Sequence, residues 1–148
     1  MNSTFRTAVL YFGFAAIPAF AQDQAQWLRQ PAISPDGNTI VFCHHGDLWS
    51  VPATGGDARP LTTTEAYESA PVWSRDGRSI AFASDRAGNF DVYVMPSEGG
   101  PSTRLTFHSA GDIPTDFTPD GTAVIFTSAR LDAAPNRQFP SGGMNELY

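Results

Sequence analysis

Short apolar runs that follow aspartate–glycine pairs recur along the chain after its first thirty or so residues. The pairs are Asp36-Gly37, Asp76-Gly77 and Asp120-Gly121, and the runs span residues 39–43, 79–83 and 123–127. An Asp-Gly pair between apolar runs favours a tight hairpin, because it supplies the positive φ angles that the turn requires. The pattern therefore predicts a β-hairpin around each pair.

Both faces of each predicted strand are apolar. Side chains alternate between the two faces of a strand, so Ile40 and Phe42 point one way whereas Val41 and Cys43 point the other. The two later runs show the same alternation, and burial of each large side chain contributes roughly 1.5 to 3 kcal/mol. Strands of this kind lie inside a stack of sheets, and no helical periodicity competes with them.

The runs belong to a repeat of about 40 to 44 residues, a period typical of propeller blades. Each repeat continues with an acid–aliphatic–aromatic triplet that predicts a third strand, and two repeats add a Gly-Gly turn and a short outer strand. The triplets are Asp47-Leu48-Trp49, Asp91-Val92-Tyr93 and Glu146-Leu147-Tyr148; the Gly-Gly turns are 55–56 and 99–100, and the outer strands are 60–62 and 104–106. The chain is therefore predicted to be an all-β, β-propeller fragment of four-stranded antiparallel blades.

The repeats predict two complete blades, at about 31–70 and 71–114, and an incomplete third at about 115–148. Closed propellers have about four to eight blades, so we expect the chain to be an N-terminal fragment of a longer protein. Alone, it would expose an apolar blade face and an unpaired sheet edge, which predicts self-association, with a homo-oligomer as one form.

The N-terminus has the pattern of a secretory signal peptide. Arg6 precedes an apolar run at 8–17, and Ala19, Phe20 and Ala21 form an A-x-A cleavage pattern. Cleavage near Ala21 leaves a mature region of 22–148, expected to be periplasmic or extracellular in a bacterium. The apolar run is about half the length of a membrane-spanning helix, so no membrane span is expected.

The net charge of −6 becomes −7 when Arg6 leaves with the signal, and no lysine is present. An acidic surface without basic runs argues against binding of nucleic acid or of anionic lipid. Cys43 is the sole cysteine. It therefore forms no internal disulfide, and we expect it to be a buried apolar residue.

The stretch FCHHGDLW, residues 42–49, resembles a metal or nucleophilic centre. Adjacent side chains such as His44 and His45 point to opposite sides of a strand, which disfavours a shared metal ion. His108, Ser109 and Asp112 lie near one another, but no G-x-S-x-G elbow accompanies them. We therefore expect no catalytic residue, metal site or cofactor in this chain.

Chain direction predicts where contacts with a partner would form. In a four-stranded meander, the loops between strands two and three and the loops between blades emerge on one rim, opposite the P-D-G and Gly-Gly turns. Variable loops on a rigid scaffold are where binding usually resides. The candidate contact residues on this rim are His44, His45, Asp85, Arg86 and His108, with Arg137 and Phe139 from the long insertion at 130–145.

Several longer stretches resemble a known family. The S-P-D-G core is similar to the propeller repeats of TolB and of several peptidases, and more specific stretches resemble the first propeller of exported tricorn-like serine peptidases. These stretches are WLRQPAISPDG, FASDRAGNFDVYVMP, TRLTFHSAGDIPTDFTPDG and SARLDAAPNRQFPSGGMNELY, within residues 27–148.

That resemblance implies a propeller that precedes a catalytic region and controls access of peptides to it. The partners it implies are further blades and the catalytic region of the same polypeptide, with peptides or other proteins as binding partners. The family's catalytic Ser, His and Glu lie downstream, so none is assigned here. Two alternatives stay open: a TolB-like protein-interaction propeller without an enzyme, and the propeller of a prolyl-oligopeptidase-like enzyme.

Overall fold

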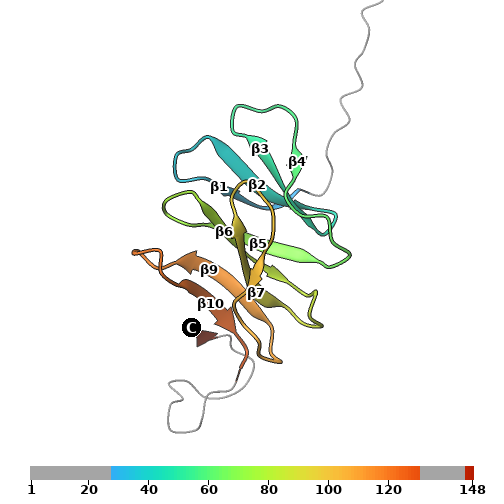
Figure 1. Ribbon diagram of the computed structural model, residues 1–148, viewed down its shortest axis with the longest axis vertical. Helices are drawn as coiled ribbons and strands as arrows, with labels where there is room; N and C mark the ends of the chain where they lie inside the picture. The colour runs from blue at the N-terminus through green and yellow to red at the C-terminus, as the bar shows by residue number, and fades with distance from the viewer. Residues whose placement is uncertain (1–27, 131–145) are drawn as a thin grey trace, which may run out of the picture.

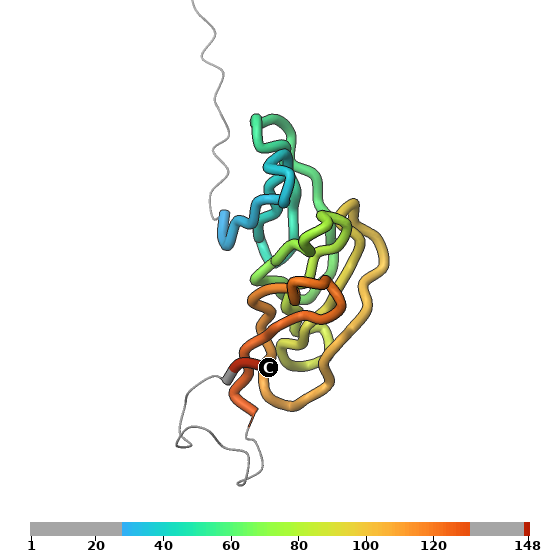
Figure 2. Tube along the Cα trace, turned by 90° about the vertical axis from the view of Figure 1, so that its left-hand side faces the viewer, coloured from blue at the N-terminus to red at the C-terminus, as the bar shows by residue number. Residues whose placement is uncertain are grey.

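Three antiparallel sheets follow one another along the chain in the computed structural model, which describes residues 28–130 and 146–148. The predicted signal peptide at 1–21, and Arg137 and Phe139 of the insertion, lie outside the described residues. Figure 1 shows the sheets from the blue first blade to the orange third, and Figure 2 shows them in the same succession from the side. Within the described residues no helix has the length and apolarity to cross a membrane.

The strands of each sheet pair in sequence order, and every pairing is antiparallel. The first blade contains β1 (Arg29–Ile33), β2 (Thr39–His44), β3 (Asp47–Pro52) and β4 (Arg59–Pro60). The second contains β5 (Glu68–Trp73), β6 (Ser79–Ser84), β7 (Asp91–Pro96) and β8 (Thr103–Arg104). The third contains β9 (Asp112–Phe117), β10 (Val124–Ser128) and β11 (Glu146–Leu147). The predicted all-β fold of four-stranded antiparallel blades is confirmed.

The Asp-Gly turns differ in one respect from the prediction. Gly37 has a φ of 75°, but Asp36 does not have a positive φ. The aspartate acts through its carboxylate instead, which accepts hydrogen bonds from Ser34 Oγ at 2.5 Å and from the Asn38 amide at 3.1 Å. These hydrogen bonds lower the pKa of Asp36, and the bond from Ser34 has the largest effect. Asp76 and Asp120 repeat the arrangement in the other two blades.

The outer strands begin earlier than the sequence predicted and are only two residues long, at Arg59–Pro60 and Thr103–Arg104. After Pro60, the Leu61 amide donates to the Leu48 carbonyl at 2.7 Å, and Thr62 Oγ1 accepts from the Leu48 amide at 2.8 Å. A threonine hydroxyl thus replaces a backbone carbonyl in the ladder, and the regular strand ends.

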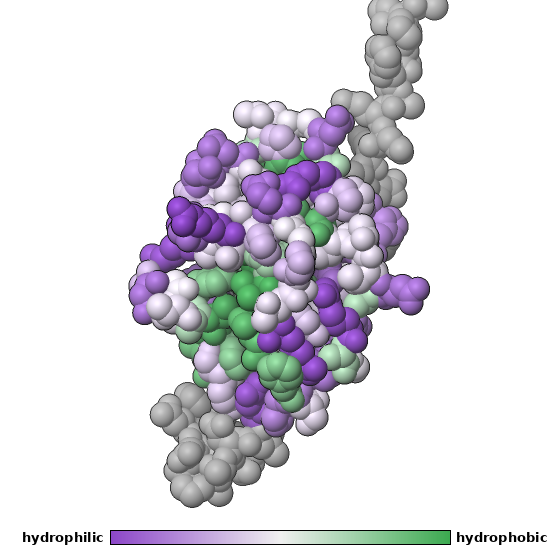
Figure 3. Space-filling model, in the orientation of Figure 1, coloured by the Kyte–Doolittle hydropathy of each residue, from purple (hydrophilic) through white to green (hydrophobic). Residues whose placement is uncertain are grey.

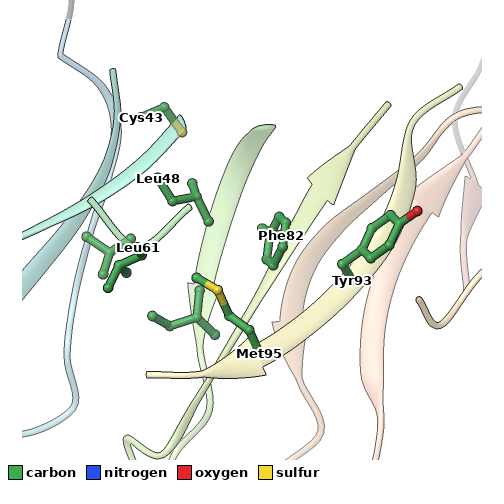
Figure 4. Packing of buried hydrophobic residues seen from close by; sticks show 8 residues of the cluster. Cys43, Leu48, Leu61, Phe82, Tyr93 and Met95 are labelled. Carbon is green, nitrogen blue, oxygen red and sulfur yellow. The ribbon is translucent and has the colours of Figure 1, made fainter. Parts of the chain in front are cut away.

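The core lies between the first two blades. Leu48 and Leu61 of the first blade face Phe82 and Met95 of the second (Figure 4), and all four are buried. Cys43 belongs to the same cluster, as expected of a buried apolar residue.

Burial of the central strands depends on having a neighbour on both sides. Every residue of β6 after Ser79 is buried, whereas only the last residue of β10 is. β5 contacts both β1 and β9, so the second blade lies between the other two. Figure 3 shows an apolar area near β9 beside an otherwise largely polar surface.

Candidate functional site

One rim of the described blades is formed by the β2–β3 and β6–β7 loops together with the segments that connect the blades. The Glu68 amide donates to the Gly46 carbonyl at 2.7 Å, and the Asp112 amide donates to the Phe90 carbonyl at 2.8 Å. Each hydrogen bond joins the loop between the second and third strands of one blade to the first strand of the next blade. The loops therefore lie side by side, as chain direction predicts.

A buried ion pair fixes this rim in the second blade. Arg86 Nη2 donates to Glu68 Oε1, Arg86 Nε donates to Ser84 Oγ at 2.9 Å, and Nη1 donates to Ser102 Oγ at 2.8 Å. The Glu68 side chain is 0% exposed and the Arg86 side chain is 27% exposed. The guanidinium carbon also lies 4.5 Å from the Tyr93 ring centroid, which adds a cation–π contact.

The third blade repeats the arrangement with different residues. Arg130 Nη2 donates to Asp112 Oδ2, and Arg130 Nε donates to Ser128 Oγ at 3.2 Å. The guanidinium carbon lies 4.9 Å from the Phe126 ring centroid and 5.0 Å from that of Tyr148. Burial alone would raise the pKa of Asp112, but hydrogen bonds from Arg130 and Ser128 outweigh it and lower that pKa.

We call these two arrangements the arginine locks: Glu68, Ser84 and Arg86 with Phe82 and Tyr93, and Asp112, Ser128 and Arg130 with Phe126 and Tyr148. The pairing of these charged residues was not predicted from the sequence: Arg86 was expected to be a contact residue, and Asp112 was considered only beside His108 and Ser109. The available signal was the repeated Ser-x-Arg at 84–86 and 128–130. In the second and third blades this signal follows a carboxylate that begins the first strand, Glu68 in β5 and Asp112 in β9.

The other predicted contact residues of the second blade also support the rim. Asp85 Oδ1 accepts from the Tyr67 amide at 2.7 Å. Asn89 Nδ2 donates to the carbonyl of His108 at 2.9 Å, and His108 Nδ1 accepts from the Ala110 amide at 3.0 Å. His108 is exposed, so its ring lies at the surface of a loop that is fixed by hydrogen bonds.

The two histidines of the first blade lie at its tightest turn. His44 ends β2 and its ring meets those of His45 and Trp49 edge-on, with centroids 4.2 and 5.9 Å apart. His45 has a φ of 53° and Gly46 a φ of 91°, so the chain reverses within these two residues. Across the described part of the chain, no group of three or more His, Cys, Asp or Glu side chains could hold a metal ion.

Cys43 lies beside these histidines and is buried. Burial raises the pKa of its thiol to about 11, so the thiolate that would act as a nucleophile is scarce at neutral pH. The Sγ atom lies 3.5 Å from Gln30 Oε1 as a weak donor.

The described rim therefore has exposed side chains on a fixed frame. Ion pairs and backbone hydrogen bonds hold its loops, while His45, Tyr67 and His108 are exposed. Such an arrangement suits recognition of a partner. Contact by the predicted residues stays a prediction, and Arg137 and Phe139 lie outside the described residues.

Comparison with known proteins places the chain among propellers of peptidases and of TolB. The family described as the tricorn protease N-terminal β-propeller domain matches residues 25–141. Dipeptidyl-peptidase 5 of Porphyromonas gingivalis is 33% identical over an alignment of 75 residues, and the match covers 44% of this chain and 11% of that protein. The chain thus spans a small part of that relative.

Solved structures show the same architecture. The structure of a putative TolB from Agrobacterium tumefaciens has a TM-score of 0.62 and 27% identity, over 80% of this chain and 40% of that one. The crystal structure of the tricorn protease has a TM-score of 0.57 and 27% identity, over 68% of this chain and 10% of that one. Both are propeller-containing proteins that extend well beyond the region shared with this chain.

Proposed function

Because the chain belongs to the family of tricorn protease N-terminal β-propeller domains, we propose that it is the propeller portion of an exported tricorn-like serine peptidase. In this role it is not catalytic itself. It serves proteolysis by guiding peptides toward the catalytic region, or by assembling that region with the propeller.

The observation that supports this role best is the pair of arginine locks on the loop-rich rim. Each lock uses the charged side chains that a catalytic centre would need, and turns them toward structural partners inside the blade. Exposed side chains on the described rim include His45, Tyr67 and His108, which lie between fixed loops. A rim of this kind can bind a peptide without activating a nucleophile.

We propose that the partners of this chain are further blades and the catalytic region of its own polypeptide. Val124, Ile125 and Phe126 of β10 are only partly buried, whereas the corresponding strand of the second blade is buried almost throughout. Another blade packed on β10 would cover these side chains. In isolation the same surface would favour association with a second copy.

Export is part of the proposal. A signal peptide cut after Ala21 would leave a mature N-terminus at Gln22, which mass spectrometry of the secreted chain would identify. An intact N-terminus on protein recovered from the cytoplasm would contradict it.

The role in proteolysis is tested with a pool of unstructured peptides. The purified chain is incubated with the pool, bound peptides are recovered with an affinity tag on the chain, and both fractions are analysed by mass spectrometry. We expect enrichment of a subset of peptides with every sequence intact. Cleaved peptides would contradict a non-catalytic role, and equal recovery with and without the chain would contradict peptide guidance.

A TolB-like protein-interaction propeller is the second candidate, because the TolB structure superposes at a TM-score of 0.62 against 0.57 for the tricorn protease. This function predicts that the tagged chain retains a folded envelope protein and no peptides from the pool. The similarity to dipeptidyl-peptidase 5 supports a third candidate, the propeller of a prolyl-oligopeptidase-like enzyme. Reading the gene further separates that candidate, since a G-x-S-x-G elbow would follow the propeller.

A further inference from the structure

The first and third blades each have one face that the other described blades do not cover. Figure 1 shows the three blades in a row, and the strands of the second blade contact both neighbours. A blade in such a row has one face toward the preceding blade and one toward the following blade. The first blade is therefore open on its preceding side, and the third is open on its following side.

The core between the first two blades shows what a junction between blades is made of (Figure 4). The following side of the first blade contributes mostly aliphatic side chains, and the preceding side of the second contributes larger ones. The buried cluster consists of Val41, Cys43, Leu48 and Leu61 from the first blade and Ile80, Phe82, Tyr93 and Met95 from the second. An open face that carries either set of positions has half of a junction.

The open face of the first blade has the positions that fill a junction from its second side. Ile40 and Phe42 point away from the second blade, because side chains alternate along β2. They stand in the repeat where Ile80 and Phe82 stand in the second blade. Trp49 pairs with Phe42 across the ladder and extends the apolar face.

Exposure at one position of the inner strand differs sharply between the blades. Trp73 of β5 donates its indole N–H to the Ala32 carbonyl of the first blade at 3.0 Å, so this position reaches the preceding blade. Phe117 of β9 stands at the same place in the repeat and is 5% exposed. Ile33 of β1 is 60% exposed, although its place in the repeat is the same. The preceding side of the first blade therefore presents an apolar surface to solvent.

The open face of the third blade has the positions that fill a junction from its first side. Leu147 stands in the repeat where Leu48 stands, but Leu48 is 0% exposed and Leu147 is 67% exposed. Thr127 pairs with Leu147 and shares its face, as does Ile125 two residues earlier. Asp116 pairs with Ile125 and is exposed in the inner strand, so a charged group borders this face at its inner edge.

Each chain thus carries the two halves of one junction at opposite ends of its row of blades. Head-to-tail contacts form a ring if the rotation between copies closes, and an open fibre if it does not. Closed propellers have about four to eight blades. With three blades in each chain, two copies give six blades, and no other number of copies falls within that range.

We propose that two copies of this chain form one six-bladed propeller, in which the third blade of each copy packs on the first blade of the other. Two identical junctions hold the dimer, each with Ile33, Ile40 and Trp49 of one copy against Ile125 and Leu147 of its partner. The inference does not depend on guidance of peptides. It concerns the chain of 148 residues, since a further blade of a longer polypeptide would occupy the same face.

Sedimentation velocity of the purified chain, over a wide range of concentration, measures the assembly. We expect a species with twice the mass of the chain and no larger species at the highest concentration, because a closed ring has no open face left. Ile33→Asp and Leu147→Asp each place a carboxylate in both junctions, where it would lose water without gaining a partner. At about tenfold per junction, each substitution should weaken dimerisation about a hundredfold.

Phe107→Asp is the matched control. Phe107 is an apolar residue that is 73% exposed, it lies in the connection between the second and third blades, and its replacement adds the same charge. This variant should change the dimerisation constant by less than about twofold. Circular dichroism and thermal unfolding check that all three variants keep the fold, which the exposure of the replaced side chains favours.

Four results would overturn the inference. A monomer at every concentration would exclude the dimer, and oligomers that keep growing with concentration would exclude a closed ring. An unchanged dimer in Ile33→Asp or in Leu147→Asp would show that two copies pair through like faces. An equal loss in Phe107→Asp would show association through exposed apolar residues in general. Each of these results leaves the proposed role in proteolysis as it stands.

Discussion

Replacing Arg86 by methionine removes the charge of the second-blade arginine lock and keeps most of the apolar stem. Glu68, with 0% exposure, would then be a buried carboxylate whose charge is uncompensated, retaining the hydrogen bond from Thr64 Oγ1 at 3.0 Å. Breaking a buried ion pair from one side costs roughly 3 to 5 kcal/mol. Since the Arg86 side chain is 27% exposed and its attraction is partly screened, we expect the lower end, about 3 kcal/mol.

The free energy of unfolding is measured by urea denaturation, with the fluorescence of Trp49 and Trp73 as the signal. Arg59→Met is the matched control, because its ion pair with Glu98 has a length of 2.8 Å but side chains that are 51% and 86% exposed. Such a surface pair contributes at most about 1 kcal/mol. The comparison therefore separates a buried pair from an exposed pair with one substitution type.

A double-mutant cycle isolates the interaction between the two side chains. Arg86→Met leaves the charge of Glu68 without a partner, and Glu68→Gln removes that charge. The free energy of unfolding lost in the double variant should therefore be smaller than the sum of the two single losses by about 2 kcal/mol. If Arg86→Met destabilises the chain no more than Arg59→Met, or if the two single effects add, the lock does not hold the rim.

Three further changes test other parts of the fold. Folding lowers the pKa below 3.8 for four aspartates, namely Asp112 and the turn residues Asp36, Asp76 and Asp120. Their contribution to the free energy of unfolding is therefore present above pH 3.8 and is lost as the pH falls through the lower folded-state values. A free energy of unfolding that stays flat from pH 6 to pH 2.5 would contradict this. Leu48→Ala should lower the free energy of unfolding, measured by urea denaturation, by about 2 to 5 kcal/mol, because Leu48 is fully buried. Phe107→Ala is the control: this residue is 73% exposed, and its replacement should change the free energy of unfolding by less than about 0.5 kcal/mol. Gly46→Ala places a side chain at a φ of 91°, with its Cβ 3.5 Å from the Tyr67 ring, and should lower the free energy of unfolding by roughly 1 to 2 kcal/mol. The control Gly111→Ala, at a residue whose φ is not positive, should be nearly neutral, and equal effects of the two substitutions would refute the strain argument.

The blades were predictable because their signals are local and repeated. Alternation of apolar residues fixed the faces of β2, and an Asp-Gly pair marked the hairpin before it. The burial of Cys43 followed from its position in that alternation. Residues 42–49, which resemble a reactive centre in one dimension, form the end of one strand, a two-residue turn and the start of the next.

The arginine locks were not predictable in the same way. Arg86 and Glu68 are separated by 18 residues and meet only because Glu68 pairs with Ser84 across β5 and β6. Which carboxylate pairs with Arg86 depends on the register of the strands and on the direction of a loop, and the local sequence predicts neither of them. The outer strands were displaced for a similar reason, since Thr62 uses its hydroxyl where a backbone bond was expected.

Amide chemical shifts of the ¹⁵N-labelled chain, recorded while an intact peptide from the enriched pool is added, test the central claim most directly. The account predicts saturable shifts confined to the loop-rich rim, at Gly46, Tyr67, Phe90 and Ala110, with the peptide recovered uncleaved. Shifts centred on the Asp-Gly turns at Gly37 and Gly77, or progressive cleavage of the peptide during the titration, would contradict a peptide-binding rim on a non-catalytic propeller.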